Sequence, residues 1–290
     1  MMIKGIVKPI LKWPGGKQSL AQKLVGFFPT DFNVYFEPFV GGASVLLAMN
    51  PEQAVIADMN SWLIDAYLAI KSNWAMVARV LDTMKNNKED FLRIRTIQPE
   101  SLNLINRAAH LIYLNKTCFR GLFRVNRKGE FNVPYGAYNR RYYDANNLLA
   151  FSRILKGVDI RMGDFEDTLQ GVTQDDFVYL DPPYYKVGGY SDFNRYTPGQ
   201  FRKDDHQRLA DLCRNLHQRG IRWAMSNSNS PFVINLFKDF FVYNISARRE
   251  INLDSKRRTI TELLITNYEV GSGLTEKYRT TASNPLESEM

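Results

Sequence analysis

Residues 176–184 have the sequence DFVYLDPPY, and they decide how the rest of the chain is interpreted. After Asp176, the four residues FVYL (177–180) form a short run of aromatic and aliphatic residues, which is typical of a buried β-strand. An acid, two prolines and a tyrosine follow at the point where this strand should end. In open α/β sheets, ligands bind outside the carboxyl ends of the parallel strands. The stretch therefore predicts a carboxylate, a stiff turn and an aromatic ring beside a binding site.

Further strands and helices are expected in alternation on both sides of this stretch. The strand patterns occur at 34–39, 54–60, 158–165, 221–228, 240–246 and 260–268. Helical patterns occur at 44–50, 61–84, 101–116, about 144–156 and 204–220, the last ending at Gly220. Strands that alternate with helices indicate an α/β fold, with a mainly parallel sheet covered on both faces.

The interval from 60 to 144 interrupts this alternation. It is mostly helical and ends in FRVNRKGEFNVPYG (123–136), which has the pattern of a β-hairpin. We therefore expect a catalytic domain in two segments, with an inserted domain between them and a disordered polar tail after it. The boundaries are 1–59 and 145–270 for the catalytic domain, 60–144 for the insert and 271–290 for the tail.

The composition favours a soluble cytoplasmic protein. Of the 290 residues 44% are hydrophobic, and no apolar run approaches the roughly 18 residues that a membrane helix needs. The start of the chain lacks the pattern of a secretory signal. The two cysteines, Cys118 and Cys213, suggest neither disulfides nor a metal site, and the three histidines lack ligand spacing. No metal is therefore expected.

Positive charge is concentrated in one stretch. The chain has 38 Lys and Arg residues against 30 Asp and Glu, a net charge of +8. Between Asn115 and Tyr143 the only acid is Glu130, and the bases are Lys116, Arg120, Arg124, Arg127, Lys128, Arg140 and Arg141. Such a block favours a polyanion partner, above all nucleic acid. A solvated basic face remains an equal alternative from charge alone.

A glycine turn follows the first strand. The sequence FEPFVGGAS (36–44) lets the backbone turn tightly at Gly41, and Asp58 ends the next strand. An acid at this position reaches ribose hydroxyls in nucleotide-binding folds. Since no base is placed to meet a phosphate, a nucleoside such as S-adenosylmethionine fits better than a dinucleotide. The alternative is a plain tight turn with Asp58 as a helix cap. A second glycine turn, KWPGGK (12–17), offers Trp13 and Lys17 as ligand contacts, or is an ordinary loop.

The residues of DPPY suit an amino group on a flat base. The exocyclic amino group of adenine is a poor nucleophile, and two acceptors aimed at its N–H bonds would favour methylation. Asp181 can supply a carboxylate, and the Pro182 carbonyl is held stiffly by Pro183. Tyr184 can stack on a flipped base, a contact worth roughly 1–3 kcal/mol. The alternative is a strand end that the prolines merely stiffen.

With these motifs the chain resembles the Dam-like DNA adenine methyltransferases. KWPGGK, FEPFVGGAS, AVIADMN, RMGDF, LDPPY and GLFRVNRKGEFNVPYG match that family in order, over roughly residues 8–268. The resemblance implies a Rossmann-like class I methyltransferase core with an inserted target-recognition domain. It implies Asp181, Pro182 and Tyr184 as catalytic residues. The implied cofactor residues are Trp13, Lys17, Glu37, Pro38, Gly41, Asp58, Asp164, Phe165 and Asp181.

The resemblance also implies double-stranded DNA as the partner and S-adenosylmethionine as the cofactor. The implied DNA contacts are Lys12, Lys116, Phe119, Arg120, Arg124, Asn132, Pro134 and Tyr138. Arg120 stands where relatives commonly have Asn, and Ala137 where they often have Arg, so the target sequence is open; GATC is the first expectation. We expect a monomer, with a cognate restriction nuclease as a possible member of the same system. Methylation of cytosine or RNA amino groups, and an inactive DNA-binding relative, remain alternatives.

Overall fold

In the computed structural model the chain forms one mixed sheet of seven strands. The structure describes residues 7–126, 128–185, 201–248 and 259–271. The strands lie in the order β3-β2-β1-β4-β5-β7-β6. Their bounds are β1 Tyr35–Glu37, β2 Ala54–Asp58, β3 Val158–Met162, β4 Phe177–Leu180, β5 Arg222–Ser228, β6 Phe241–Arg248 and β7 Thr259–Thr266. Five of these strands lie within the stretches where the sequence predicts strands, whereas β6 continues two residues beyond its predicted stretch and β7 begins one residue before its own.

The strand directions and the strand order indicate where a ligand would bind to this sheet. Strands β3, β2, β1, β4 and β5 run parallel to one another, whereas β7 is antiparallel to both β5 and β6. The order reverses between β1 and β4, and ligands of open α/β sheets bind at such a reversal, outside the carboxyl ends of the strands. The Rossmann-like α/β expectation is confirmed, and DPPY follows β4 at this point.

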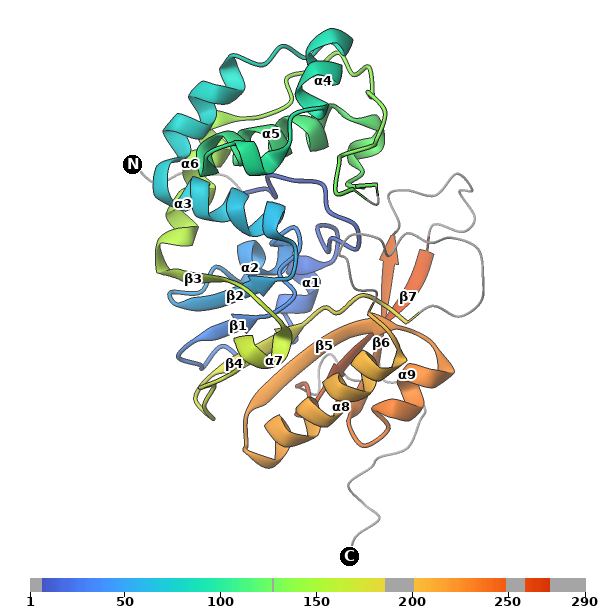
Figure 1. Ribbon diagram of the computed structural model, residues 1–290. Coiled ribbons are helices and arrows are strands. Elements are labelled where there is room, and N and C mark those ends of the chain that lie inside the picture. Colours follow the sequence, from blue (N-terminus) through green and yellow to red (C-terminus); the bar gives the residue numbers. More distant parts are fainter. Residues whose placement is uncertain (1–6, 127, 186–200, 249–258, 272–290) are drawn as a thin grey trace, which may run out of the picture.

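Helices cover both faces of the sheet (Figure 1). The bounds of the α-helices are α1 Ala21–Val25, α2 Ser44–Met49, α3 Ser61–Asp82, α4 Lys88–Arg95, α5 Leu104–Thr117, α6 Ala145–Ile154, α7 Phe165–Thr168, α8 Lys203–Gln218 and α9 Pro231–Leu236. Short 3-10 turns lie at Pro99–Ser101, Phe119–Gly121 and Leu155–Gly157. Gly220 closes α8 in the left-handed conformation, as its sequence position predicts.

The two faces of the sheet carry separate apolar clusters, because alternate residues of a strand point to opposite sides. In β4, Phe177 and Tyr179 join the cluster formed with α1, α2, α3 and α6. Val178 and Leu180 join the other, formed with α7, α8 and α9. The near-continuous apolar run of β4 therefore results from burial on both sides, which is typical of parallel sheets.

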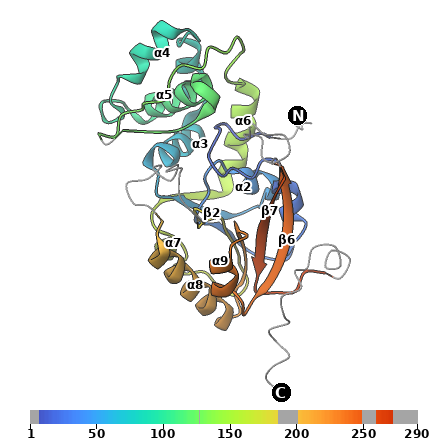
Figure 2. The ribbon, with the colours of Figure 1, turned by 90° about the vertical axis from the view of Figure 1, so that its right-hand side faces the viewer.

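The segment from 61 to 144 contributes no strand to the sheet among its described residues. Its helices α3, α4 and α5 form the upper part of the molecule in Figure 2. Within α3 the backbone is non-helical at Asn73, so the helix is kinked there. The predicted hairpin is reduced to two isolated antiparallel bridges, Cys118–Tyr135 and Val125–Phe131. Pro134, which has no N–H to donate, lies between these bridges and limits the ladder.

Several short helices were not predicted. Helices α1, α4, α7 and α9 have between four and eight residues, too few for a helical period to stand out. In SNSNS (226–230), Ser226, Asn227 and Ser228 belong to β5, and Ser230 caps α9 by accepting from the Val233 N–H. Most of the predicted tail, 272–290, lies outside the described residues. Within the described part of the chain, no helix is long and apolar enough to span a membrane.

Candidate functional site

Acidic side chains come together at the carboxyl edge of the sheet. Glu37 is the last residue of β1 and Asp58 the last of β2. Asp181 directly follows β4, and Asp164 follows β3 by two residues. Because β3, β2, β1 and β4 are adjacent and parallel, these carboxylates lie along one edge. Asp58, Asp164 and Asp181 thus lie at or just after the ends of parallel strands of one sheet.

Lys17 and Asp181 form a buried ion pair. The Lys17 ammonium lies 2.7 Å from both carboxylate oxygens of Asp181 and donates to the Gly15 carbonyl at 2.9 Å. The Lys17 side chain is only 4% exposed. Burial raises the pKa of Asp181 to about 6, while Lys17 lowers it and Glu262 raises it. Lys17 thus faces a carboxylate of the protein itself, whereas the sequence analysis offered it as a ligand contact.

Glu37 and Pro38 are buried below this edge. The Tyr35 hydroxyl donates to Glu37 Oε2 at 3.0 Å. Burial raises the pKa of Glu37 well above its ordinary value. When Glu37 is protonated, its carboxyl can donate a hydrogen bond as well as accept one. When it is ionised, it can only accept.

The glycine turn is held by Asp58. The Gly41 N–H donates to one Asp58 oxygen at 3.1 Å and the Asn60 N–H to the other at 2.9 Å. Burial raises the pKa of Asp58 to about 6, and these N–H donors limit the rise. Gly41 has φ +45°, and a Cβ there would lie 3.2 Å from the Trp13 ring. A side chain at this position would strain the backbone and press on the indole, so glycine is favoured here.

Asp164 and Phe165 lie where β3 passes into α7. Asp164 caps α7 by accepting from the Glu166 N–H at 3.0 Å, and Arg208 of α8 lies 3.0 Å from the same carboxylate. Phe165 is buried, with its ring 5.5 Å from that of Phe39. The Asp164 carboxylate is therefore at the edge, whereas the Phe165 side chain supports it from inside the core.

Pro182 and Tyr184 continue from Asp181. Pro182 is buried, and Tyr184 is half-buried. The Tyr184 hydroxyl donates to Glu262 Oε2 at 2.8 Å, and the Lys17 ammonium lies 4.8 Å from the centre of its ring. The acid, the rigid turn and the ring that the sequence places together are thus joined through Lys17 into one cluster.

Asn115 ties the loop 12–17 to the helical segment. Its buried amide accepts from the Lys12 N–H at 2.8 Å and donates to the Lys12 carbonyl at 2.9 Å. It also donates to the Gly121 carbonyl at 3.1 Å. In addition, the Trp13 ring lies 5.0 Å from that of Phe123. One loop therefore contacts both the glycine turn and the basic segment.

The residues predicted to contact DNA are mostly exposed around the two bridges. Arg124 donates from Nε to the Asn132 side-chain oxygen at 2.7 Å and from Nη2 to the Asn132 carbonyl at 3.1 Å. The exposed Phe119 donates its N–H to the Pro134 carbonyl at 2.8 Å. The structure thus brings together Arg124 and Asn132, and likewise Phe119 and Pro134.

Arg120 has an unusual backbone, with φ +59°, and its N–H donates to the Tyr138 hydroxyl at 2.7 Å. Lys116 is half-buried on α5. Burial, together with the nearby charges of Lys12 and Arg140, lowers the pKa of Lys116 to about 8. Positive charges that already repel one another are stabilised by an anionic partner.

A family model described as D12 class N6 adenine-specific DNA methyltransferase matches residues 13–251. The chain belongs to this family. It is therefore an enzyme that methylates the amino group of adenine in DNA, and the cytosine, RNA and inactive alternatives are set aside. The family and the fold imply S-adenosylmethionine as the methyl donor.

Individual relatives match this methyltransferase over nearly its whole length. It is 38% identical over 287 residues to the type II methyltransferase M.MjaIII of Methanocaldococcus jannaschii, covering 90% of this chain and 99% of the relative. It is 36% identical to the type II methyltransferase M1.LlaDCHI of Lactococcus lactis, covering 90% and 96%. It is 29% identical to the DNA adenine methylase of Haemophilus influenzae, covering 89% and 92%.

The residues at the edge of the methyltransferase fit such a donor. S-adenosylmethionine offers ribose hydroxyls, an adenine amino group, an ammonium and a cationic sulfonium, and each of these favours a carboxylate neighbour. Asp58, Asp164 and Asp181 supply carboxylates at the strand ends, and Asp58 holds the glycine turn that packs against Trp13. Among the described residues, no group of His, Cys, Asp and Glu is arranged to hold a metal ion.

Three residues of this site were missed in the sequence of the methyltransferase. Glu262 contacts Tyr184 from β7, Arg208 contacts Asp164 from α8, and Asn115 holds Lys12 from α5. Only Glu262 leaves a signal, because it is the single charged residue in the otherwise apolar and hydroxylated strand TITELLIT. A lone acid in such a strand can indicate a polar partner, but the sequence does not tell which one.

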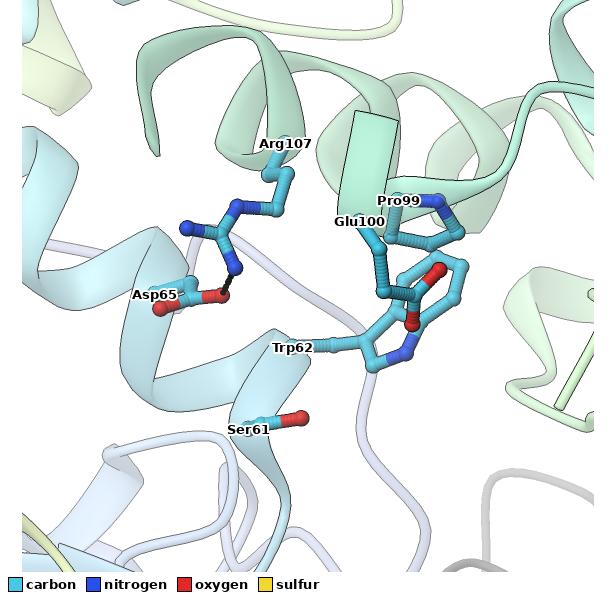
Figure 3. Close-up of a pocket in the computed structure, with 6 residues that line it drawn as sticks. All are labelled: Ser61, Trp62, Asp65, Pro99, Glu100 and Arg107. Atoms are coloured by element: carbon cyan, nitrogen blue, oxygen red, sulfur yellow. Dashed lines mark ion pairs between the residues drawn. The ribbon is translucent and has the colours of Figure 1, made fainter. Parts of the chain in front are cut away.

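A small pocket in the helical segment contains none of the predicted site residues. Figure 3 shows Arg107 of α5 pointing toward Asp65 of α3, with the ion pair at 2.7 Å. The buried Nε of Arg107 has no hydrogen-bond partner among the described residues. The lining residues are Ser61, Trp62, Asp65, Pro99, Glu100 and Arg107. Because its ion pair joins α3 to α5, we assign the pocket to the packing of the helical segment.

Proposed function

We propose that the methyltransferase binds S-adenosylmethionine along the carboxyl edge and methylates an adenine that is turned out of duplex DNA. Asp58 accepts from the ribose hydroxyls, and Asp164 accepts from the adenine amino group of the donor. The Gly41 turn and Trp13 form the wall beside them. The support lies in the glycine turn and in carboxylates at the ends of the parallel strands β2, β3 and β4. When bound, the donor supplies an electrophilic methyl group.

The target adenine is held by Asp181, Pro182 and Tyr184. The Asp181 carboxylate and the Pro182 carbonyl accept from its two amino hydrogens, and this draws the nitrogen toward a tetrahedral geometry. Tyr184 stacks on the ring and offsets part of the few kcal/mol that extrusion costs. The proton that the methylated nitrogen loses passes to Asp181 or to water. Asp181 needs no great basicity for this, since the methylated cation is a strong acid.

Lys17 balances the charge of Asp181 before the ligands bind. Its ammonium bridges both oxygens of the carboxylate, which still has lone pairs for a further donor. An ionised carboxylate is thereby kept inside a buried site, where burial alone would favour the neutral form.

The segment 60–144 serves as the target-recognition domain. Arg124 and Lys12 read base edges, with Asn132 and Pro134 beside them, while Phe119 enters the duplex. Lys116, Arg120 and Tyr138 hold the phosphate backbone. GATC is the first sequence to test, although Arg120 and Ala137 depart from the pattern of the family.

We further propose that the enzyme acts as a monomer within a restriction–modification system. The two type II methyltransferases are more similar to this chain than the DNA adenine methylase of Haemophilus influenzae. Such a system would include a nuclease of the same target sequence.

The observation that carries this proposal is the Asp181–Pro182 turn directly after β4, where the strand order reverses. The test is to incubate the enzyme with S-adenosylmethionine and genomic DNA and to map modified bases at single-nucleotide resolution. We expect N6-methyladenine within one short sequence. Methylation of another base, or of adenines without sequence preference, would contradict the proposal.

A second experiment tests the eversion of the base. A duplex with 2-aminopurine at the mapped adenine should change its fluorescence strongly when the enzyme binds, and 2-aminopurine one position away should not. Equal fluorescence at both positions would exclude base flipping.

A further inference from the structure

Glu262 brings an acid from the antiparallel strand to the active-site edge. Its neighbours Leu263 and Leu264 are buried, whereas its own side chain keeps 19% of its exposure. In the pairing of β5 with β7, Glu262 lies opposite Ser228, the last residue of β5. Because β5 ends at the same edge as β4, this register places the carboxylate beside the turn that carries Asp181 and Tyr184.

The contacts of Glu262 are to active-site residues. Its Oε2 accepts from the Tyr184 hydroxyl at 2.8 Å, and the same oxygen lies 4.0 Å from the Lys17 ammonium. Lys17 in turn holds Asp181 at 2.7 Å and lies over the Tyr184 ring. Glu262, Tyr184, Lys17 and Asp181 therefore form one cluster of two acids, one base and one phenol.

The hydrogen bond fixes the hydroxyl end of a ring whose face lies 4.8 Å from the Lys17 ammonium. Pro182 and Pro183 stiffen the backbone before Tyr184, but they do not set the direction of its ring. A phenol that donates to a carboxylate makes a charge-assisted bond, about twice as strong as a neutral one. The tip of the ring is thereby anchored to β7 of the sheet. Stacking depends on such orientation, because a misplaced ring loses overlap with the base.

We propose that Glu262 is a positioning residue for methyl transfer, whose carboxylate holds the Tyr184 ring in the orientation that a target base requires. This role rests on the proposed function of Tyr184 and deepens it. Glu262 does not itself touch the reacting atoms. Its effect on the reaction is expected to pass through the Tyr184 hydroxyl.

The test compares single-turnover methylation rates of four variants with saturating duplex and donor. Glu262→Ala removes the acceptor of the Tyr184 hydroxyl. We expect the rate to fall about tenfold, which is the effect of losing one hydrogen bond worth about 1.4 kcal/mol in the transition state. In Glu262→Gln an acceptor oxygen remains, so most of the rate should return. Tyr184→Phe removes the donor and should be slowed like Glu262→Ala. The double variant Glu262→Ala/Tyr184→Phe should be no slower than the slower single variant.

Two readouts separate positioning from a general structural effect. Duplex affinity, measured by fluorescence anisotropy, should change less than about twofold in Glu262→Ala, while the rate falls. Thermal unfolding should give similar midpoints for Glu262→Ala and Glu262→Gln. Glu269→Ala is the matched control, because this exposed acid lies just after the same strand.

An unchanged rate in Glu262→Ala would overturn the proposal. A Glu262→Gln enzyme as slow as Glu262→Ala would also overturn it, as would additive losses with Tyr184→Phe. Failure of the proposed function has a different signature, because the wild type and Glu269→Ala would then leave adenines unmodified in every duplex.

Discussion

At the scale of single residues, the charge state of Asp181 should govern the pH dependence of catalysis. Burial raises its pKa to about 6, against the opposing charge of Lys17 and with a smaller contribution from Glu262. The amino group needs an acceptor, and only the ionised carboxyl offers its full set of lone pairs. The single-turnover rate should therefore be constant above about pH 7 and fall as the pH drops through about 6.

This prediction is checked by rapid-quench measurements between pH 5 and pH 8, at buffers of equal ionic strength. The unfolding midpoint is followed in parallel, so that loss of the fold is not mistaken for protonation. A rate that stays flat down to about pH 5 would show that Asp181 keeps an ordinary pKa in the complex.

Arg124 carries the prediction about sequence preference. Its guanidinium is exposed and oriented by Asn132, with bonds of 2.7 and 3.1 Å. A bidentate contact between arginine and guanine is worth roughly 1–3 kcal/mol of discrimination. Methylation of a randomised duplex library by Arg124→Ala should show relaxed preference at one base pair, which Arg153→Ala, on α6, should not. Uniformly weaker methylation with unchanged preference would make Arg124 a phosphate contact instead.

At the scale of elements, Asn115 joins helix α5 to the loop that carries Lys12, Trp13 and Lys17. Its amide is fully buried and makes hydrogen bonds to both backbone groups of Lys12 and to the Gly121 carbonyl. Removing one partner from a buried hydrogen bond costs about 1–3 kcal/mol. Asn115→Ala should therefore lower the free energy of unfolding by about 3 kcal/mol.

Urea denaturation measures this loss, and Asn106→Ala on the same helix is the control. The variant should also bind S-adenosylmethionine more weakly in calorimetry, because Trp13 and Lys17 lie in the loosened loop. Stability and donor affinity that both match those of the wild type would mean that α5 does not position the loop.

Much of the fold could be predicted at this scale, whereas the site could be predicted only in part. Runs such as DFVYL and AVIAD locate the strands, because burial on both faces leaves a plain apolar pattern. The acids at strand ends followed from the parallel sheet. The contact between Tyr184 and Glu262 did not, since it joins residues 78 positions apart on an antiparallel strand whose register the sequence does not reveal. The partner of Lys17 was missed because Lys17 lies in a loop 164 positions from Asp181, and the sequence does not show how that loop packs against the end of β4.

At the scale of the whole molecule, acid should weaken the fold through His206. This residue of α8 is 1% exposed, and among the described residues neither ring nitrogen has a hydrogen-bond partner. The rings of Tyr185, Phe201 and Phe232 surround it. Burial lowers its pKa to about 4. Between about pH 6.5 and pH 4 the His206 side chain is therefore protonated in the unfolded chain but neutral in the folded one. The stability that the neutral, buried His206 contributes is complete above pH 6.5 and declines as the pH falls toward 4.

Comparing the wild type with His206→Phe isolates this effect. The raised pKa values of Asp58 and Asp181 change stability in the opposite direction on acidification, but they are common to both proteins. In urea titrations the wild type should lose more stability than the variant between pH 7.5 and pH 5. Parallel losses in the two proteins would show that His206 is protonated equally in both states.

The central claim is that the Asp181 carboxylate and the Pro182 carbonyl accept hydrogen bonds from the amino group of an adenine turned out of the duplex. The most direct test is the single-turnover rate of N6-methyladenine formation by Asp181→Asn, beside the exposed control Asp167→Asn. Electrostatic groups of this kind are worth about a hundredfold to a thousandfold in rate. We predict at least a hundredfold loss for Asp181→Asn, with duplex affinity close to that of the wild type. The unfolding midpoint should fall, because Lys17 loses its buried charge partner, so the rates are compared at a temperature where both proteins are folded. An Asp181→Asn enzyme that methylates adenine as fast as the wild type would contradict the account.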